Sequence, residues 1–480
     1  MKAEKLAGLQ PAEVFGYFEK LCAIPHGSGN TKAISDYLVS FAKEQGLRYI
    51  RDEANNVILF KAASPGYEDH GPVILQGHMD MVCEKDEDCA IDMEKDGLDI
   101  THDGSAVFAR GTTLGGDNGI AVAYALALLA DKNAAHPPLE VVITVDEEIG
   151  MLGAAVIDLS MLKGRTLINL DSEEEGIFTV SCAGGATATL SLPVQRRAVY
   201  GPCISLRVEG LQGGHSGVEI HKNRANANKV MGELLSRIQK VMPVCLTSFA
   251  GGGKDNAIPR SCQVNLVMLG MDPAPINDII AQLQQEIRQQ YDEPDAVILG
   301  DNVDALGGNA LPADVTAKVV GLLCAAPNGV QKMSGDIEGL VQTSLNMGIA
   351  ELSQAFKMVF SVRSSVNEEK LELLQQLEKL AQFYDGEYTQ MGDYPAWEYK
   401  KDSRLRDTMV QVYSRMWGKE PQIVAIHAGL ECGLLGEKLP GLDAVSIGPD
   451  MTDIHTSRER LDISSTERTW KFLLEVLKEL

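Results

Sequence analysis

The chain has 480 residues, 45% of them hydrophobic and 23% charged, which is typical of a globular enzyme with more than one domain. Its 43 basic and 67 acidic residues give a formal net charge of −24, which argues against nucleic acid or an anionic membrane surface as a partner. The longest apolar run, residues 119–130, is too short to cross a bilayer. The nine cysteines are odd in number and unpatterned, so we expect reduced thiols in a cytoplasmic protein.

The first part of the chain alternates between helical and extended patterns. Periodicity and turn residues predict, in order, helices at 11–21 and 31–45, strands within 48–61 and at 72–77, and a helix at 120–131 behind a glycine-rich loop at 111–119. The strand at 72–77 runs directly into His78-Met-Asp80. His78 and Asp80 are two residues apart and share a face of the chain, so the carboxylate is placed to orient the imidazole ring.

Three adjacent carboxylates follow the next strand. Val141 to Val145 is a β-branched run that predicts a buried strand, and Asp146, Glu147 and Glu148 come directly after it. Three acids at the end of a buried strand repel one another, and a bound cation is the simplest compensation. One glutamate could then bind metal while its neighbour faces a substrate. The alternative is a solvated acidic turn, which is the commoner fate of such a run.

Strands and helices continue to alternate up to about residue 183. A helix at 152–162 and a strand at 166–170, followed by Asp171, complete the pattern of an α/β domain, with a mostly parallel sheet and helices on both of its faces. The character of the chain then changes, and it returns to the first pattern near the C-terminus. We therefore predict a catalytic domain at 1–185 and 397–480, and an α+β lid domain inserted at 186–396.

The insert is predicted to contain strands and amphipathic helices. Its expected strands include 203–209, 262–269 and 355–363, and its expected helices are 225–241, 276–291 and 368–383.

Several polar residues are placed just beyond strand ends, where ligand sites of open α/β sheets lie. Taken singly, each has an ordinary interpretation: Asp117 as a helix N-cap, Asp171 as a turn residue, and His455 as a surface or core histidine. Together with His78 and Glu148 they form a mixed set of histidines and carboxylates. Such a set suits zinc, and also manganese or cobalt, and it is large enough for two metal ions that share one carboxylate.

These motifs resemble a known family. His78-Met-Asp80, Gly116-Asp-Asn-Gly119, Asp146-Glu-Glu148, Asp171 and His455 follow the motif order of the di-zinc aminoacylase/carboxypeptidase/dipeptidase family of metallopeptidases. The strings at 111–120, 170–176 and 426–433 are similar to its bacterial aminoacylhistidine dipeptidase branch. The likeness extends over essentially the whole chain. It implies a zinc-exopeptidase-like catalytic domain with an inserted lid. The segment His455-Thr-Ser-Arg-Glu459 departs from the His-Ser-Pro-Asp/Glu of many relatives, which affects the expected shape of that loop.

The resemblance implies a role for each of these residues. Asp117 would bridge two zinc ions, His78 and Asp171 would complete one site, and Glu148 and His455 the other. Asp80 would orient His78, and Glu147 would act as the general base. Family members often have a cis peptide bond after the bridging aspartate, which here is Asp117–Asn118.

Four further residues are candidates for binding substrate. By the family likeness His215, in Gly213-Gly-His-Ser-Gly217, would stabilise an oxyanion, often across a dimer interface, and Asn256 would contact substrate. Arg363 would clamp a substrate carboxylate, a task that suits its planar guanidinium. The alternatives are a glycine turn with an incidental histidine and a surface salt bridge. Glu431 could hold the free amine of a dipeptide.

The expected protein is a cytoplasmic di-zinc dipeptidase that dimerises through its lid domain. Its substrates would be unblocked dipeptides, including Xaa-His such as β-alanyl-histidine. One rival is a tripeptidase or N-acyl amino acid deacylase of the same fold, and Glu431 discriminates because an N-acyl substrate has no free amine. A second rival, from a different class, is a non-catalytic metal-dependent binding protein, which would have no use for Glu147 as a base. A structural or interaction protein is a further alternative.

Overall fold

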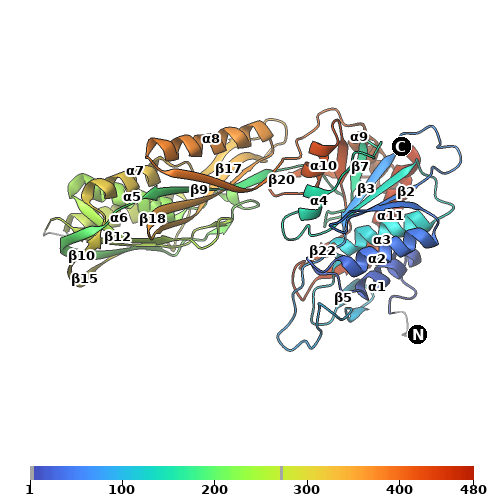
Figure 1. The fold of residues 1–480 in the computed structure, drawn as a ribbon, viewed down its shortest axis with the longest axis horizontal. Helices are drawn as coiled ribbons and strands as arrows, with labels where there is room; N and C mark the ends of the chain where they lie inside the picture. Colours follow the sequence, from blue (N-terminus) through green and yellow to red (C-terminus); the bar gives the residue numbers. More distant parts are fainter. Residues whose placement is uncertain (1–4, 271–273) are drawn as a thin grey trace. The chain divides into compact units, whose positions relative to one another are not determined.

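A computed structural model describes residues 5–270 and 274–480 of the chain. The chain divides into two compact units. The first contains residues 1–181, 399–425 and 430–480, and the second contains residues 182–398 and 426–429. Figure 1 shows the elements of each unit in the colours of the sequence.

The first unit is built on an eight-stranded sheet whose centre is parallel. Its strand order is β1-β2-β6-β3-β7-β21-β8-β20. The neighbours β6, β3, β7 and β21 run parallel, whereas β1, β2 and β8 pair antiparallel at the margins. The strands are β1 Arg48–Arg51, β2 Val57–Lys61, β3 Val73–His78, β6 Leu139–Thr144, β7 Thr166–Asn169, β8 Ile177–Cys182, β20 Gln422–Ile426 and β21 Asp443–Ser446. Every residue of β3 and β6 is buried, as expected for parallel strands covered on both faces.

Helices flank this sheet, with α1, α2 and α3 on one side and α4 and α10 on the other (Figure 1). They are α1 Ala12–Cys22, α2 Lys32–Glu44, α3 Gly116–Ala130, α4 Leu152–Val156, α9 Arg404–Trp417, α10 Cys432–Lys438 and α11 Ile463–Glu479. A smaller sheet of order β22-β23-β5-β4 comprises Met451–Thr452, Arg460–Asp462, Ala106–Ala109 and Ile100–His102. The predicted metal ligand His455 lies in the connection between β22 and β23.

The second unit is an antiparallel sheet of order β15-β10-β14-β12-β17-β18-β9-β19, to which β16 adds by pairing with β17. Its strands are β9 Gly184–Pro193, β10 Arg197–Glu209, β12 Val244–Gly251, β14 Cys262–Met268, β15 Val297–Ala310, β16 Gly329–Met333, β17 Val341–Leu352, β18 Ala355–Ser364 and β19 Glu387–Tyr394. Helices α5 Ala227–Val241, α6 Ala274–Gln290, α7 Ala313–Ala325 and α8 Asn367–Phe383 cover one face (Figure 1). The buried side chains of this unit lie between helices and sheet.

Most expected elements are present, and the structure differs from the expectation in three places. The helix expected over 152–162 ends at Val156. The strand β15 was not expected, because it is an exposed edge strand rich in glycine, aspartate and asparagine. The helix α7 was not among the expected helices either. Residues 426–429, placed by the sequence in the catalytic domain, group with the second unit. There Ala183 donates its backbone N–H to the Ile426 carbonyl, and Ser344 hydrogen-bonds to His427.

Candidate metal centre and active site

Adjacent parallel strands bring the predicted residues to one edge of the first sheet. His78 ends β3, Glu147 and Glu148 follow β6, and Asp171 follows β7. Since β6, β3 and β7 are hydrogen-bonded neighbours that run in the same direction, their carboxyl ends meet. Ligand sites of open α/β sheets lie at this edge.

Asp117, at the start of α3, lies between two histidines. Its Oδ1 is 3.2 Å from His78 Nε2, and its Oδ2 is 3.2 Å from His455 Nε2. His78 Nε2 is also 3.4 Å from Asp171 Oδ1, and His455 Nε2 is 3.0 Å from Glu148 Oε1. Each oxygen of Asp117 therefore faces a different histidine and carboxylate pair.

The negative charges of this cluster favour the binding of a cation. No lysine or arginine in the described part of the chain forms an ion pair with Asp117, Glu148 or Asp171. Burial opposes a charge on His78, yet Asp171, Asp117 and Asp80 raise the pKa of this imidazole well above its usual value. The His455 ring can donate hydrogen bonds to the carboxylates of Asp117 and Glu148, and these bonds raise the pKa of His455 to about 10. Ligand atoms of His78, Asp117 and Glu148 lie within 4.8 Å of one another. A metal ion would supply the positive charge and leave both imidazoles neutral, so the donor set fits such ions.

Asp80 links the histidine to the acidic segment. Its carboxylate lies 3.4 Å from His78 Nδ1, and its backbone carbonyl is 3.0 Å from the same nitrogen. The carboxylate also accepts the backbone N–H groups of Glu147 and Glu148, at 3.1 and 3.4 Å, and the Ser28 hydroxyl at 2.8 Å. Asp80 is fully buried. It is therefore placed to hold the imidazole and both glutamates at once.

Asn118 was not identified from the sequence as a site residue, although it ties three elements together. The Asp117–Asn118 peptide bond is cis, as the family resemblance implies. The Asn118 side chain accepts the His78 N–H at 3.1 Å and donates to the Leu170 carbonyl at 2.9 Å. A side chain at Gly77 would collide with its carbonyl oxygen, so only glycine fits there.

Glu431 lies fully buried in the first unit with one oxygen unpaired. Its Oε2 accepts hydrogen bonds from Gln76 Nε2 and from Thr144 Oγ1, the latter at 2.6 Å. Its Oε1 has no hydrogen-bond partner among the residues that the structure describes. Burial raises the pKa of Glu431 to about 7. The sequence singled out Glu431 but not Gln76 or Thr144, which were hidden within apolar strand patterns.

In the second unit, the short strands β11 (Gly214–His215) and β13 (Ala257–Ile258) pair with each other. The pairing places His215 opposite Ala257, next to Asn256, whose side chain is exposed. Two backbone N–H groups, of Gly217 and Val218, donate to His215 Nδ1 at 3.1 and 3.3 Å. Because Nδ1 is an acceptor, the proton of the neutral ring resides on Nε2.

Arg363, near the end of β18, has no carboxylate partner among the described residues. Its Nη1 donates to the Tyr394 hydroxyl at 3.3 Å, and its buried Nε is unpaired. Gly185 pairs with Arg363 across the sheet, and a side chain there would meet the Tyr394 hydroxyl. A surface salt bridge, the alternative considered for this arginine, is therefore not observed.

Comparisons with known proteins identify the family of the chain. The sequence model of peptidase family M20/M25/M40 matches residues 74–479 of the chain. The chain belongs to this family. It is 37% identical to the "Cytosol non-specific dipeptidase" of Escherichia coli (strain K12), over 99% of each chain. A crystal structure of aminoacylhistidine dipeptidase from Vibrio alginolyticus is 35% identical, with a TM-score of 0.95 over 99% of this chain and 98% of that one.

A more distant likeness concerns the fold alone. The structure of aminopeptidase PepT from Bacillus cereus ATCC 10987 is 14% identical, with a TM-score of 0.56 over 98% of this chain and 99% of that chain. Among the helices that the structure describes, none is long and apolar enough to cross a membrane.

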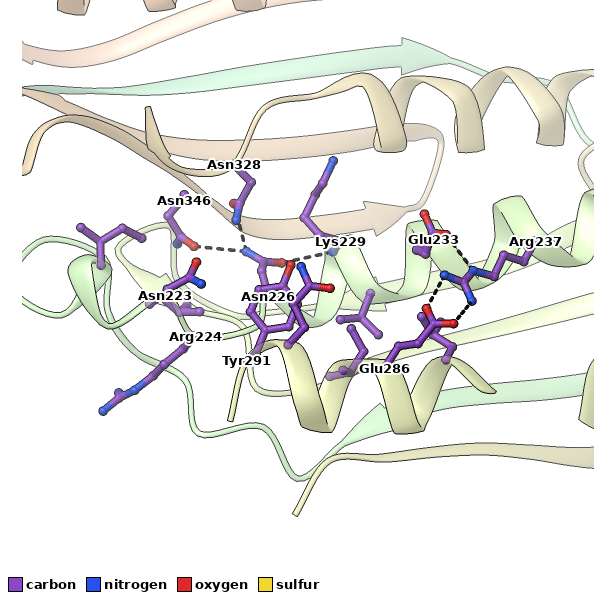
Figure 2. Close-up of a pocket in the computed structure, with 17 residues that line it drawn as sticks. Asn223, Arg224, Asn226, Lys229, Glu233, Arg237, Glu286, Tyr291, Asn328 and Asn346 are labelled. Carbon is purple, nitrogen blue, oxygen red and sulfur yellow. Dashed lines mark hydrogen bonds and ion pairs between the residues drawn. The ribbon is translucent and has the colours of Figure 1, made fainter. Parts of the chain in front are cut away.

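A separate cavity of about 430 Å³ lies in the second unit of this M20 chain, between α5, α6 and the neighbouring loops (Figure 2). Figure 2 shows Arg237 between Glu233 and Glu286, with hydrogen bonds of 2.7 Å to each. Lys229 donates to three backbone carbonyls at the end of α7, and Arg224 pairs with Glu219. The charged side chains around this cavity therefore all have partners.

The neutral state of His215 can be tested directly. Burial, followed by the nearby Arg363 guanidinium, lowers the pKa of His215 below its usual value of 6.5. We expect ¹⁵N NMR of the histidine side chains to show His215 as the Nε2–H tautomer at pH 7, titrating at a pH below 6.5. A Val218→Pro variant, which lacks one of the two donors, would serve as the comparison. An Nδ1–H tautomer would contradict this hydrogen-bond assignment.

Proposed function

We propose that this M20 peptidase is a dipeptidase that hydrolyses unblocked dipeptides, with Xaa-His such as β-alanyl-histidine among its substrates. One observation carries the proposal: the two oxygens of Asp117 face two separate histidine and carboxylate pairs. The names of the relatives support the substrate class, since proteins 37% and 35% identical over nearly the full chain are called dipeptidases.

The metal centre would consist of two ions, with zinc the first choice and cobalt or manganese as substitutes. Asp117 would bridge them, with His78 and Asp171 on one side and Glu148 and His455 on the other. When bound, the ions supply the positive charge that polarises a peptide carbonyl and makes a water molecule more acidic. Asp80 would orient His78 through their hydrogen bond.

Glu147 is the proposed general base. It is adjacent to Glu148, and Asp80 accepts its backbone N–H, but no group in the described part of the chain hydrogen-bonds to its carboxylate. Burial raises the pKa of Glu147 well above the usual glutamate value. The carboxylate would take a proton from the water that attacks the scissile carbonyl carbon, and would give it to the amine that leaves as the C–N bond breaks.

Glu431 would select substrates with a free amine. Its unpaired Oε1 can accept a hydrogen bond from an ammonium group, while Gln76 and Thr144 hold its other oxygen in place. We expect Glu431→Gln to raise KM for unblocked dipeptides about 10- to 100-fold, equivalent to about 1.4–3 kcal/mol of a charge-assisted hydrogen bond.

The control for Glu431 is Gln76→Leu, which removes one supporting hydrogen bond but retains the carboxylate. It should raise KM much less than Glu431→Gln. Steady-state kinetics on Ala-Ala would measure both values. If Glu431→Gln left KM unchanged, the amine would be recognised elsewhere.

The second unit would provide the remaining substrate contacts. His215, as an Nε2–H donor, would stabilise the developing oxyanion, and Asn256 would contact the substrate. The guanidinium of Arg363, which forms no ion pair with a carboxylate of the described residues, would bind the substrate carboxylate. This unit, predicted as residues 186–396, would serve as the lid and form the contact of a homodimer. The proposed location is the cytoplasm.

A substrate panel would test the proposed function. Purified protein would be assayed on carnosine, Gly-His, Ala-Ala, Ala-Ala-Ala and N-acetyl-methionine, with added zinc and after chelation. Metal-dependent cleavage of the free dipeptides is the expected result. Cleavage of only the tripeptide or only the acetylated compound would instead identify a tripeptidase or a deacylase. Two bound metal ions without any turnover would indicate a binding protein.

A further inference from the structure

Glu459 forms a clamp between two loops of the proposed metal centre. One oxygen of its carboxylate accepts the backbone N–H groups of Leu114 and Gly115, at 2.7 and 3.1 Å. The other accepts those of Gly116 and Asp117, at 2.7 and 3.3 Å. The side chain is only 3% exposed. A single buried carboxylate thus satisfies four consecutive donors, the last of which belongs to Asp117.

The other end of the clamp is close to His455. A tight turn separates Glu459 from this histidine: Thr456 donates its hydroxyl to the Asp453 carbonyl at 2.7 Å, and Glu459 donates its N–H to the Thr456 carbonyl at 3.1 Å. His455 itself has a φ of 59°, in the left-handed region that few residues other than glycine adopt. The turn therefore has little freedom, and a shift of Glu459 would move the imidazole.

We propose that Glu459 is a positioning residue that holds Asp117 and His455 at the separation that two metal ions require. It touches neither substrate nor metal, and it acts through the backbone of one proposed ligand and the loop of another. Groups behind the metal ligands commonly change metal affinity 10- to 100-fold when they are replaced. This inference rests on the proposed metal centre.

Gly116 supports the same assignment from the opposite side. A Cβ atom at this position would lie 3.1 Å from Glu459 Oε1 and 3.1 Å from Met451 Sδ. Both contacts are tighter than most real Cβ contacts, so an alanine would displace the Glu459 carboxylate, the Met451 side chain or both. Gly116→Ala therefore perturbs the clamp without altering the carboxylate itself.

Glu140 provides a matched control for Glu459, because it is a buried carboxylate whose role is only structural. Glu140, in β6, is also buried, at 5% exposure, and its two oxygens accept the backbone N–H groups of Lys163 and Gly164 at 2.9 and 3.0 Å. It lies near the opposite end of its strand from Glu147 and Glu148. Glutamine at either position retains the shape but turns an N–H₂ donor toward backbone N–H donors. Both variants should lose stability, but only the change at Glu459 should affect metal binding.

The experiment compares the full-length wild-type protein with Glu459→Gln, Glu140→Gln and Gly116→Ala. Zinc affinity would be measured by competition with a chromophoric chelator, and the visible spectrum would be recorded after loading with Co²⁺. We expect Glu459→Gln to bind at least one zinc ion 10- to 100-fold more weakly and to change the Co²⁺ spectrum. Gly116→Ala should shift affinity in the same direction, and Glu140→Gln should match the wild type in both measurements.

Several outcomes would overturn the inference. Wild-type zinc affinity and an unchanged Co²⁺ spectrum in Glu459→Gln would do so, as would equal losses in Glu140→Gln. If Glu459→Gln fails to fold, the zinc affinity and the Co²⁺ spectrum of Gly116→Ala would test the inference instead, and wild-type values of both would overturn it. If the wild-type protein itself bound fewer than two zinc ions, the proposed two-metal centre would be wrong. This result can be distinguished from a failure of the inference about Glu459, which concerns the variants alone.

Discussion

Replacing Glu147 with glutamine is expected to lower kcat for dipeptide hydrolysis by about 10²- to 10⁴-fold, the range typical of a lost general acid or base. The amide cannot accept a proton from water or return it to the leaving amine. Its size and position are otherwise retained, so the metal ions should remain bound. Steady-state kinetics on Ala-Ala, together with the metal content by mass spectrometry, would measure both effects.

The neighbouring Glu148→Gln variant provides the contrast. Glu148 lies 3.0 Å from His455 Nε2, so its loss should reduce metal content and activity together, and excess zinc should restore part of the activity. Zinc should not rescue Glu147→Gln. If Glu147→Gln lost metal instead, the two adjacent glutamates would have exchanged the roles proposed for them.

Removing the metal ions is expected to abolish hydrolysis and to lower the Tm of the protein by about 5–10 °C. A ligand at 100 times its Kd stabilises the folded state by about 2.7 kcal/mol, and each kcal/mol corresponds to about 2–4 °C for a domain of this size. Without cations, the only ion-pair partners that the described residues offer to Asp117, Glu148 and Asp171 are the two histidines. Calorimetry and activity after dialysis against a chelator would test this.

Reloading with zinc should restore both Tm and activity, and Asp117→Asn should abolish the Tm gain on adding zinc. This variant keeps the shape of the side chain but weakens the link between the two sites. An apo protein with full activity would rule out a metal-dependent reaction. An unchanged Tm with lost activity would mean that the ions bind too weakly to stabilise the fold at the concentrations used.

The residues at the ends of strands were predictable from the sequence because strand patterns locate both a strand and its end. His78, Glu148 and Asp171 each follow a buried apolar run, and the structure brings His78 within 3.4 Å of Asp171. The length of the short helix α4 was overestimated, because apolar residues continue after Val156 although the backbone there is no longer helical. The periodicity of apolar residues alone does not distinguish a helix from a following segment that is apolar but not helical.

The supporting residues could not be predicted because their roles depend on contacts between distant segments. Asn118 bonds to His78 and Leu170, Gln76 bonds to Glu431, and Glu459 bonds to four residues more than 340 positions earlier in the chain. Nothing local in the sequence marks an asparagine in a glycine-rich loop, or a glutamine inside an apolar run, as a hydrogen-bond partner. The family resemblance supplied the proposed ligands, but it did not supply these contacts.

The order of strands in the first sheet has a consequence for synthesis of the protein. Strand β21 lies between β7 and β8, yet it is made after the entire second unit. While the ribosome is translating residues 182–398, the sheet has a vacant position at its middle, and two unpaired strand edges face it. His455 and Glu459 emerge later still. The second unit can fold during translation, but the proposed metal centre can assemble only after His455 and Glu459 have been synthesised. Until then the first unit is incomplete and exposed to aggregation.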